Sequence, residues 1–284
     1  MPRLGLHGLA FTPLWDPTEA DSLLPAILKH GVTVIETPLL DPKNYDSKGT
    51  RAVAEKYGVE IVCSLGLPND IDVATQMEEA IDFLAVSLNA ARNAGAACLS
   101  GVTYGSIGKT SGAPVTQSEL DVTARLLERV AKIARSLNLK LGIEPCNRYE
   151  THLLNTARQS AQIIERVGLD NIFIHLDTYH MNIEEISMSA AFADAGEHLG
   201  YVHLSESNRG VPGRGTMDWK DTFNGLKAVA YDGTMTLESF VYLAPEIASG
   251  LAVWRPVAEH AKDVVGIGLP FLSEKARAAG LELW

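Results

Sequence analysis

Short apolar runs rich in β-branched residues alternate along the chain with longer stretches of helical spacing. The apolar runs predict strands, and the stretches between them predict helices because apolar residues recur there every three or four positions. The strands are expected at 3–11, 32–38, 60–68, 96–102, 139–145, 172–177, 199–206 and 233–239. The helices are expected at about 18–29 (with Thr18 as N-cap), 47–57, 71–93, 115–136, 155–167, 184–196, 218–229 and 246–262.

This alternation predicts the fold class. The strands are continuously apolar instead of alternating with period two, as in a parallel sheet that is buried on both faces. Eight strand–helix units without a linker favour an α/β protein with a closed (β/α)8 TIM barrel over an open doubly wound sheet. The 284 residues suit one such domain, spanning 1–284. Functional residues of this fold lie at the carboxyl ends of the strands.

Carboxylate and imidazole side chains lie at the ends of four successive predicted strands. The run IFIHLD ends in Asp177, and a carboxylate at the end of a buried strand is costly unless a cation, a metal or water compensates it. Three other strands repeat the pattern with Glu144, His203 and Glu238. The separations are 33 (144 to 177), 26 (177 to 203) and 35 residues (203 to 238), each about one strand–helix unit. We therefore expect the four side chains to meet at one end of the barrel.

Three carboxylates and one imidazole make an oxygen-rich donor set. Such a set suits Mn²⁺ or Mg²⁺, with Co²⁺ also compatible, better than structural Zn²⁺, which prefers sulfur and nitrogen. Singly, each residue has an ordinary alternative as a helix cap or an ion-pair partner, and the recurrence at four strand ends favours a metal site. His175 has the same strand facing as Asp177 one layer deeper, and we interpret it as a core histidine and not as a ligand.

A second set of polar residues follows the first on the predicted loops. Glu150 lies six residues after the first carboxylate, His180 three after the second, and Arg209 six after the histidine. We expect all three to point at whatever the metal binds, while solvated loop charges remain the alternative, above all for Arg209. Glu206 and Arg214 are interpreted as ordinary loop residues.

One glycine-rich segment, GSIGKT at 105–110, is similar to a phosphate-binding loop. That motif needs glycine where this chain has Thr103, and it needs a helix where SGAP follows. We expect a flexible loop at the barrel mouth and no nucleotide cofactor.

Composition narrows the range of partners. The chain is 46% hydrophobic and 21% charged, as expected for a soluble globular protein. Its formal net charge of −11 argues against nucleic acid and anionic membranes as partners. Cys63, Cys98 and Cys146 form no C-x-x-C motif and are typical of buried thiols in a reducing compartment. The chain shows neither a membrane-length apolar run nor a signal-peptide cleavage site, so we expect a cytoplasmic enzyme or binding protein.

Four motifs carry a family resemblance: IEPCNRYETHLLNT, LDTYHMNIEE, GYVHLSESNRGVPGRGTMDW and YDGTMTLESF. They resemble the ketose 3-epimerases, the D-tagatose and D-allulose 3-epimerase group of the xylose isomerase-like sugar isomerase barrels. The resemblance is densest from 139 to 240. It implies one Mn²⁺-type ion and a homodimer or homotetramer. It also implies four metal ligands (Glu144, Asp177, His203, Glu238) and four substrate contacts (Glu150, His180, Arg209 and, in an apolar pocket, Trp15).

The chain departs from the family pattern at two places. Glu238-Ser239-Phe240 stands where relatives read EPF, which keeps the carboxylate. The loop after the fourth strand has Tyr104 and Ile107 and lacks the tryptophan expected there. The second departure leaves recognition of the C4–C6 end of the sugar open.

These residues predict epimerisation of a free ketose at C3. The C3 hydrogen lies next to the C2 carbonyl, so its removal gives an enediolate, which a divalent ion chelating O2 and O3 would stabilise. Inversion needs a base on each face of that planar species, and Glu144 and Glu238 are the candidates. The alternatives are an aldose–ketose isomerase on the same scaffold, such as a hydroxypyruvate or pentose isomerase, a metal-dependent abasic-site endonuclease, and a non-catalytic sugar-binding barrel. Which ketose is preferred stays open.

Overall fold

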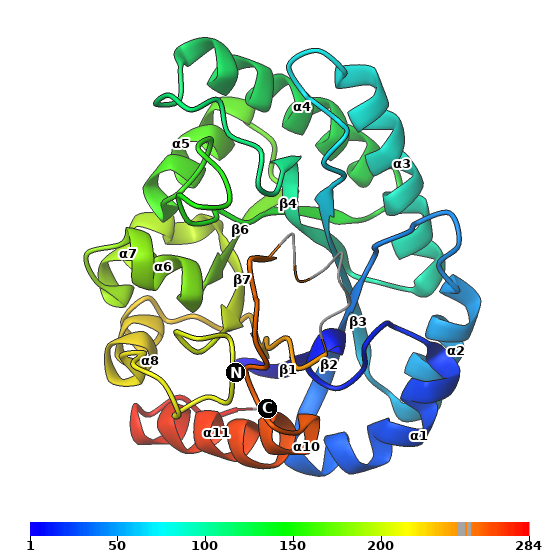
Figure 1. Cartoon of the computed structure of the whole chain (residues 1–284), viewed down its shortest axis with the longest axis vertical. Coiled ribbons are helices and arrows are strands. Elements are labelled where there is room, and N and C mark those ends of the chain that lie inside the picture. Colours follow the sequence, from blue (N-terminus) through cyan, green and yellow to red (C-terminus); the bar gives the residue numbers. More distant parts are fainter. Residues whose placement is uncertain (243–247, 249–250, 284) are drawn as a thin grey trace.

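Eight parallel strands close into a barrel in the computed structural model, which describes every residue except 243–247, 249–250 and 284 (Figure 1). Each strand pairs with the next in sequence, and the last pairs with the first. The predicted (β/α)8 TIM barrel is therefore confirmed. The strands are β1 (Arg3–His7), β2 (Val32–Pro38), β3 (Glu60–Leu67), β4 (Cys98–Ser106), β5 (Lys140–Ile143), β6 (Ile172–Asp177), β7 (Leu199–Leu204) and β8 (Thr234–Leu237).

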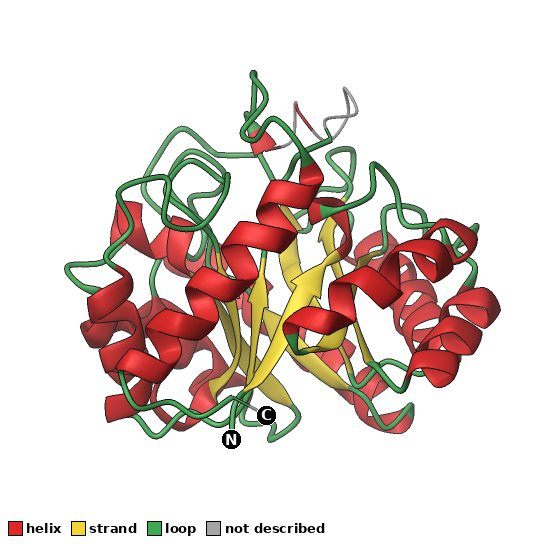
Figure 2. Cartoon of the chain, turned by 90° about the horizontal axis from the view of Figure 1, so that it is seen from below, coloured by secondary structure: helices red, strands yellow, loops and turns green. Residues whose placement is uncertain are grey.

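The α-helices lie outside the barrel and enclose the strands (Figure 2). Their inner faces supply most of the hydrophobic core, which joins them to the outward side chains of the strands. The helices are α1 (Pro17–Ile27), α2 (Ser47–Tyr57), α3 (Met77–Ala94), α4 (Gln117–Ser136), α5 (Ala157–Val167), α6 (Thr178–Glu184), α7 (Met188–Ala195), α8 (Trp219–Ala228), α10 (Ala261–Asp263) and α11 (Leu269–Ala278). No helix among the described residues is both long and apolar enough to span a membrane.

Local sequence explains several helix ends. At the start of α4, the Thr116 hydroxyl accepts from the Glu119 amide while the Glu119 carboxylate accepts from the Thr116 amide, which is a capping box. Gly58 and Gly95 end α2 and α3 in the left-handed conformation that glycine adopts without strain. Helix α1 is capped by Asp16, whose side chain accepts from two amides of the first turn. The prediction of Thr18 as the N-cap was therefore wrong.

The predicted last helix, 246–262, was wrong over most of its described part. Residues 246–247 and 249–250 lie outside the described residues, residues 248 and 251 are helical, and residues 253–260 form no helix. Pro256 lies in this stretch, and proline both lacks an amide hydrogen and disfavours helix in the preceding residue. The helical segment instead runs through α10, a π-helical turn (Val264–Gly268) and α11. Its buried Leu269, Leu272 and Ala276 have the helical spacing that the sequence analysis left unused.

Strand β4 is longer than predicted and takes in the first part of the glycine-rich segment. The strand runs to Ser106, whose hydroxyl donates to the carbonyls of Pro68 and Ile71. Beyond it, Lys109 forms an ion pair with Asp72, with 3.2 Å between Nζ and Oδ2. These contacts tie the segment to the loop after β3.

Candidate active site

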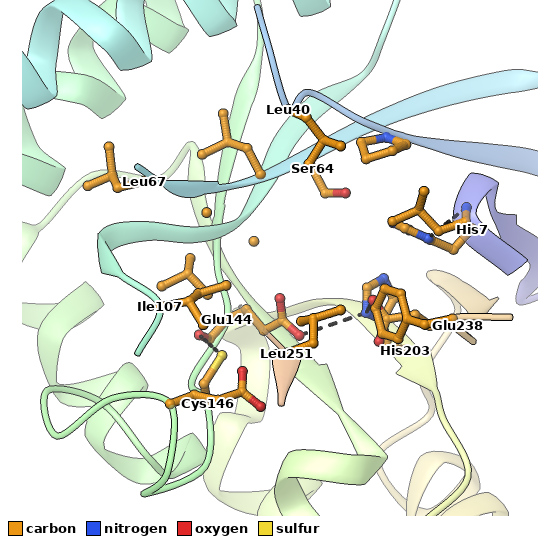
Figure 3. A pocket seen from close by; sticks show the side chains of 18 of the residues that line it. His7, Leu40, Ser64, Leu67, Ile107, Glu144, Cys146, His203, Glu238 and Leu251 are labelled. Atoms are coloured by element: carbon orange, nitrogen blue, oxygen red, sulfur yellow. Dashed lines mark hydrogen bonds and ion pairs between the residues drawn. The ribbon is translucent and has the colours of Figure 1, made fainter. Parts of the chain in front are cut away.

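A cavity of about 370 Å³ opens at the carboxyl ends of the strands (Figure 3). Glu144 directly follows β5, Glu238 directly follows β8, and His203 lies near the end of β7, so all three reach the cavity from strand ends. Asp177 ends β6 and pairs in register with His203. The structure thus brings together the four side chains that the strand-end pattern singled out. All four are buried.

His203 shows why this cluster suits a cation. Its Nε2 lies 2.7 Å from Oε2 of Glu36, so a neutral imidazole donates there and turns the Nδ1 lone pair toward the cluster. Nδ1 is buried and has no hydrogen-bond partner among the described residues. It lies 3.3 Å from Oε1 of Glu238 and 3.8 Å from Oε1 of Glu144. Although burial opposes it, Glu238 and Glu36 raise the pKa of His203 well above its usual value, so this position holds a positive charge, either a proton on Nδ1 or a cation that replaces it between the carboxylates.

The donor atoms are also close enough for one ion. One ligand atom from each of Asp177, His203 and Glu238 lies within 4.8 Å of the others. Glu144 lies next to this group, since its Oε1 is 3.8 Å from Nδ1 of His203. Carboxylate oxygens with one imidazole nitrogen match the preference of Mn²⁺, Mg²⁺ or Co²⁺. The residues present therefore fit a divalent ion.

The carboxylates of the cluster differ in their electrostatic surroundings. Burial raises the pKa of Glu144 well above its usual range, against the opposing effect of His203. Burial also raises the pKa of Asp177, to about 6, although Arg209 acts against it. Burial acts the same way on Glu238, but His203 and Arg209 outweigh it and hold its pKa well below the usual range. The carboxyl groups of the cluster thus differ in how readily each holds a proton.

Arg209 is part of this cluster. It is 4% exposed, and its Nη1 donates to Oδ2 of Asp177 at 2.6 Å and to Glu238. The guanidinium lies over the ring of Tyr179, with 4.0 Å from Cζ to the ring centroid, and near Phe240. The residue has a left-handed backbone with φ of 60°, which costs energy for a side chain other than glycine. The alternative interpretation of Arg209 as a solvated loop charge is wrong.

His180 and Glu150 lie beside it and line the same cavity. His180 is 2% exposed, and its Nε2 lies 3.7 Å from Oε1 of Glu144 and 3.8 Å from Oδ2 of Asp177. Burial lowers the pKa of His180 well below its usual value. Burial raises the pKa of Glu150 to about 6.

Trp15 lies apart from this group. Its indole nitrogen donates to the Thr50 hydroxyl on α2 at 2.9 Å, and its ring packs against Gly8. Among the described residues, those that line the cavity do not include Trp15. The structure therefore does not bring Trp15 into the pocket, where the resemblance implied it.

Glu36 is the main residue that the sequence analysis missed. It is fully buried in β2 and accepts from His203 and from the Tyr201 hydroxyl, at 2.7 and 2.8 Å. Although burial opposes it, His203 and then His7 lower the pKa of Glu36 to about 2. The signal was present, because the run VTVIE at 32–36 ends in a carboxylate just as the later strands do.

Glu206 was interpreted wrongly as an ordinary loop residue. It is fully buried, and its carboxylate accepts from the amides of Ser207, Gly213 and Met217 and from the Trp219 indole. It organises the loop that carries Arg209. Arg214 is exposed, as expected of a loop residue.

His175 is fully buried behind the cluster. Its Nδ1 is 3.0 Å from the Ser100 hydroxyl and 3.9 Å from Oε2 of Glu144, and its ring packs edge-on against His203. These contacts are those expected of a core histidine below the cluster.

Fold and cluster together define a barrel of the sugar isomerase class, and comparison with known proteins agrees. The family described as xylose isomerase-like TIM barrel matches residues 24–262. The L-ribulose 3-epimerase of Methylomonas sp. (strain DH-1) is 33% identical over 278 residues, which cover 95% of this chain and 96% of that protein. The ketose 3-epimerase of Arthrobacter globiformis is 32% identical over 97% of both chains.

Solved structures agree with these relatives. The crystal structure of a D-allulose 3-epimerase from Methylomonas sp. in complex with D-allulose has a TM-score of 0.90 and 31% identity, and the match covers 96% of this chain and 97% of that one. This chain belongs to the ketose 3-epimerases of the xylose isomerase-like barrel family, which are isomerases that act on carbohydrates.

Proposed function

We propose that this chain interconverts free 2-ketoses at C3, with D-allulose, D-tagatose or L-ribulose as the type of substrate. One observation carries the proposal: two buried carboxylates, Glu144 and Glu238, reach a single cavity from β5 and β8, strands that β6 and β7 separate. The names of the relatives, L-ribulose 3-epimerase and ketose 3-epimerase, support it.

Two carboxylates match what inversion at C3 requires. The hydrogen on C3 is acidic because the C2 carbonyl delocalises the charge that its removal leaves. A planar enediolate results, and its inversion needs a proton delivered to the face opposite the one from which it left. One of Glu144 and Glu238 takes the proton as a general base, and the other returns a proton as a general acid. In the reverse direction the two exchange roles.

One divalent ion, Mn²⁺ by preference with Mg²⁺ or Co²⁺ as alternatives, belongs to this proposal. Glu144, Asp177, His203 and Glu238 would hold it. When bound, it would act as a Lewis acid toward the oxygens next to the reacting carbon. The orphaned Nδ1 of His203 supports this assignment.

The remaining polar groups would fix the C1–C3 end of the sugar. Arg209 and His180 place N–H groups beside the carboxylates, where negative charge develops on the substrate oxygens. Glu150 has a buried Oε2 without a hydrogen-bond partner among the described residues, so it would accept from a sugar hydroxyl.

The other end of the cavity is largely apolar. Leu67 and Ile107 lie on the opposite side from His203 and Glu238 (Figure 3). Leu40 also lines the cavity, as does Leu251, which packs against Leu9 and Phe240. Ser64 and Asn69 are polar exceptions. Since apolar walls discriminate weakly between hydroxyl configurations, we expect the enzyme to accept several ketoses that differ at C4–C6. Among the residues that the structure describes, this wall presents no cation for a terminal phosphate, so the proposed substrates are unphosphorylated.

Incubation in D₂O with Mn²⁺ and a panel of free ketoses tests the proposal. An epimerase places deuterium at C3 and yields the C3 epimer, as NMR shows directly. Each of Glu144→Gln and Glu238→Gln should lower turnover to background, because each removes the proton carrier of one face. Deuterium confined to C1 or C2, with an aldose as product, would instead show the isomerase reaction. Full turnover in either glutamine variant would refute the two-base assignment.

A homodimer or homotetramer is a further part of the proposal. Tyr149 and Ile186 are 76% and 96% exposed, and residues close to them in sequence, Arg148 and Glu184, form an ion pair, so we propose these exposed apolar side chains for subunit contact. Light scattering on the purified protein measures the oligomeric state, and a monomeric mass would contradict this part.

A further inference from the structure

Asn147 is buried next to the cavity-lining residues His180 and Glu150, two of the groups that the proposed reaction uses. Its side-chain nitrogen lies 2.8 Å from Nδ1 of His180 and 2.8 Å from Oε1 of Glu150. Its backbone amide also donates to Nδ1 of His180, at 3.1 Å. Asn147 is 1% exposed.

The orientation of the Asn147 amide follows from its hydrogen bonds. Its Oδ1 accepts from the backbone amide of Tyr149 at 3.0 Å, so the oxygen faces Tyr149 and the NH₂ group faces His180 and Glu150. An inverted amide would place an oxygen against the Glu150 carboxylate and an NH₂ group against an amide hydrogen. The assignment of the two atoms is therefore unambiguous.

Two N–H donors directed at one ring nitrogen determine the tautomer of His180. The backbone amide can only donate, so Nδ1 must be an acceptor, and in the neutral ring the hydrogen lies on Nε2. Nε2–H faces the cavity, 3.7 Å from Oε1 of Glu144. His180 therefore presents a donor to the substrate.

The tautomer of His180 also determines the nature of its contact with Arg209. Nη2 of Arg209 lies 3.2 Å from Nε2 of His180, and a guanidinium never accepts a hydrogen bond. Both nitrogens carry hydrogen, so they do not bond to each other. They form a pair of adjacent donors suited to one oxygen that carries negative charge.

We propose that Asn147 is a positioning residue that fixes His180 as the Nε2–H tautomer, so that His180 and Arg209 donate together to one oxygen of the ketose. The inference rests on the proposed function for the identity of that oxygen, which is the one that gains charge when C3 loses its proton. The tautomer itself is a property of the protein without substrate. Asn147 acts through His180 and does not touch the reacting atoms.

The tautomer is measured first, without substrate. Histidine-¹⁵N-labelled protein loaded with Mg²⁺, which is diamagnetic, gives two-bond ¹⁵N–¹H correlations, and the His180 signals are those lost in His180→Gln. We expect an unprotonated Nδ1 and a protonated Nε2 in the wild type. A protonated Nδ1 in the wild type would overturn the proposal, whether or not any ketose is turned over.

Two substitutions distinguish a positioning role of Asn147 from a role in packing alone. Asn147→Asp keeps the shape but places a charged acceptor against Nδ1, and a charge-assisted bond outweighs the longer one from the backbone amide. Nδ1 should therefore gain a proton and kcat should fall about 100-fold, the cost of a misplaced oxyanion donor. Asn147→Ala leaves the backbone amide in place, so the tautomer should persist and kcat should fall less than about 10-fold. A residue needed only for packing gives the opposite order, because alanine removes every side-chain contact. That order, or an unchanged tautomer in Asn147→Asp, would overturn the proposal.

Repulsion between the new carboxylate and Glu150 is controlled in the Glu150→Gln background. Asn147→Asp should lower kcat by a similar factor there, because the effect acts through His180. If the Glu150→Gln background abolishes the effect, charge repulsion explains it and the positioning role is wrong.

Discussion

Glu36 should control how tightly the cluster binds its metal ion, although it is not a predicted ligand. Its carboxylate is fully buried and accepts the Nε2 hydrogen of His203 at 2.7 Å. This bond directs the Nδ1 lone pair toward Glu144 and Glu238 and makes the imidazole more basic. Glu36→Leu removes the acceptor, so His203 has an unpaired buried N–H and is free to rotate.

The expected magnitude follows from this single contact. Loss of a hydrogen-bonded partner behind a ligating histidine weakens metal binding by about 10- to 100-fold, or roughly 1.4–2.7 kcal/mol. Glu36→Gln keeps an acceptor but removes the charge, so we expect about 10-fold or less. Leucine should therefore weaken binding more than glutamine.

Isothermal titration of metal-free protein with Mn²⁺ measures this without reference to activity. Thr236→Val is the matched control, since it removes the contact between the Thr236 and Tyr201 hydroxyls but leaves the bond between Glu36 and His203. We expect the control to bind Mn²⁺ within about 2-fold of the wild type, because the histidine keeps its partner. Wild-type affinity in a folded Glu36→Leu variant would refute the reasoning.

Three further predictions concern the same site. Exhaustive EDTA treatment should abolish turnover, and Mn²⁺ or Co²⁺ should restore it best, because the donor set is oxygen-rich; full activity after chelation would contradict the metal requirement. The pKa of Glu150 is raised from 4.5 to about 6 in the folded state, so its stabilising effect is greatest below pH 4.5 and is lost as the pH rises through 6. Glu150→Gln lacks this dependence, so its free energy of unfolding relative to the wild type should increase by roughly 2 kcal/mol between about pH 4.5 and pH 7.5, as urea denaturation measures; a pH-independent difference would count against the shift. Tyr104→Phe removes a buried hydroxyl that lies 2.9 Å from the Glu144 carbonyl and should cost about 1–2 kcal/mol, and an unchanged midpoint of thermal unfolding would show that the bond contributes nothing.

The barrel could be predicted from the sequence because its strands are uninterrupted apolar runs and because capping residues and glycines mark the ends of several helices. Strand β2 and helix α2 match their predicted bounds. The last helix could not be placed, because the prediction extended an apolar pattern through Pro256 and ignored the spacing of Leu269 and Leu272. Thr18 failed as a cap because Asp16, two residues earlier, accepts from two amides at once.

The strand-end cluster was predictable for a similar reason, since each member interrupts an apolar run at its end. Glu36 shares that property and was overlooked, because the search for polar residues at strand ends did not include the second strand. Asn147 carries no such mark, because its role depends on where His180 lies, 33 residues later. Burial of Glu206 was equally hidden, since its four donors come from positions 207–219 and meet only in the folded loop.

The loop around Glu206 has a consequence for engineering. The Glu206 carboxylate accepts hydrogen bonds from donors that the loop itself supplies, together with the first residue of α8, so the segment from 206 to 219 carries its own partners for this group. Exchange of this segment between homologous barrels should preserve the placement of Arg209 only when the glutamate and its donors move together. A chimera whose junction falls between Glu206 and Met217 would inherit a buried carboxylate with missing partners, and its barrel would be destabilised before its substrate range could be altered.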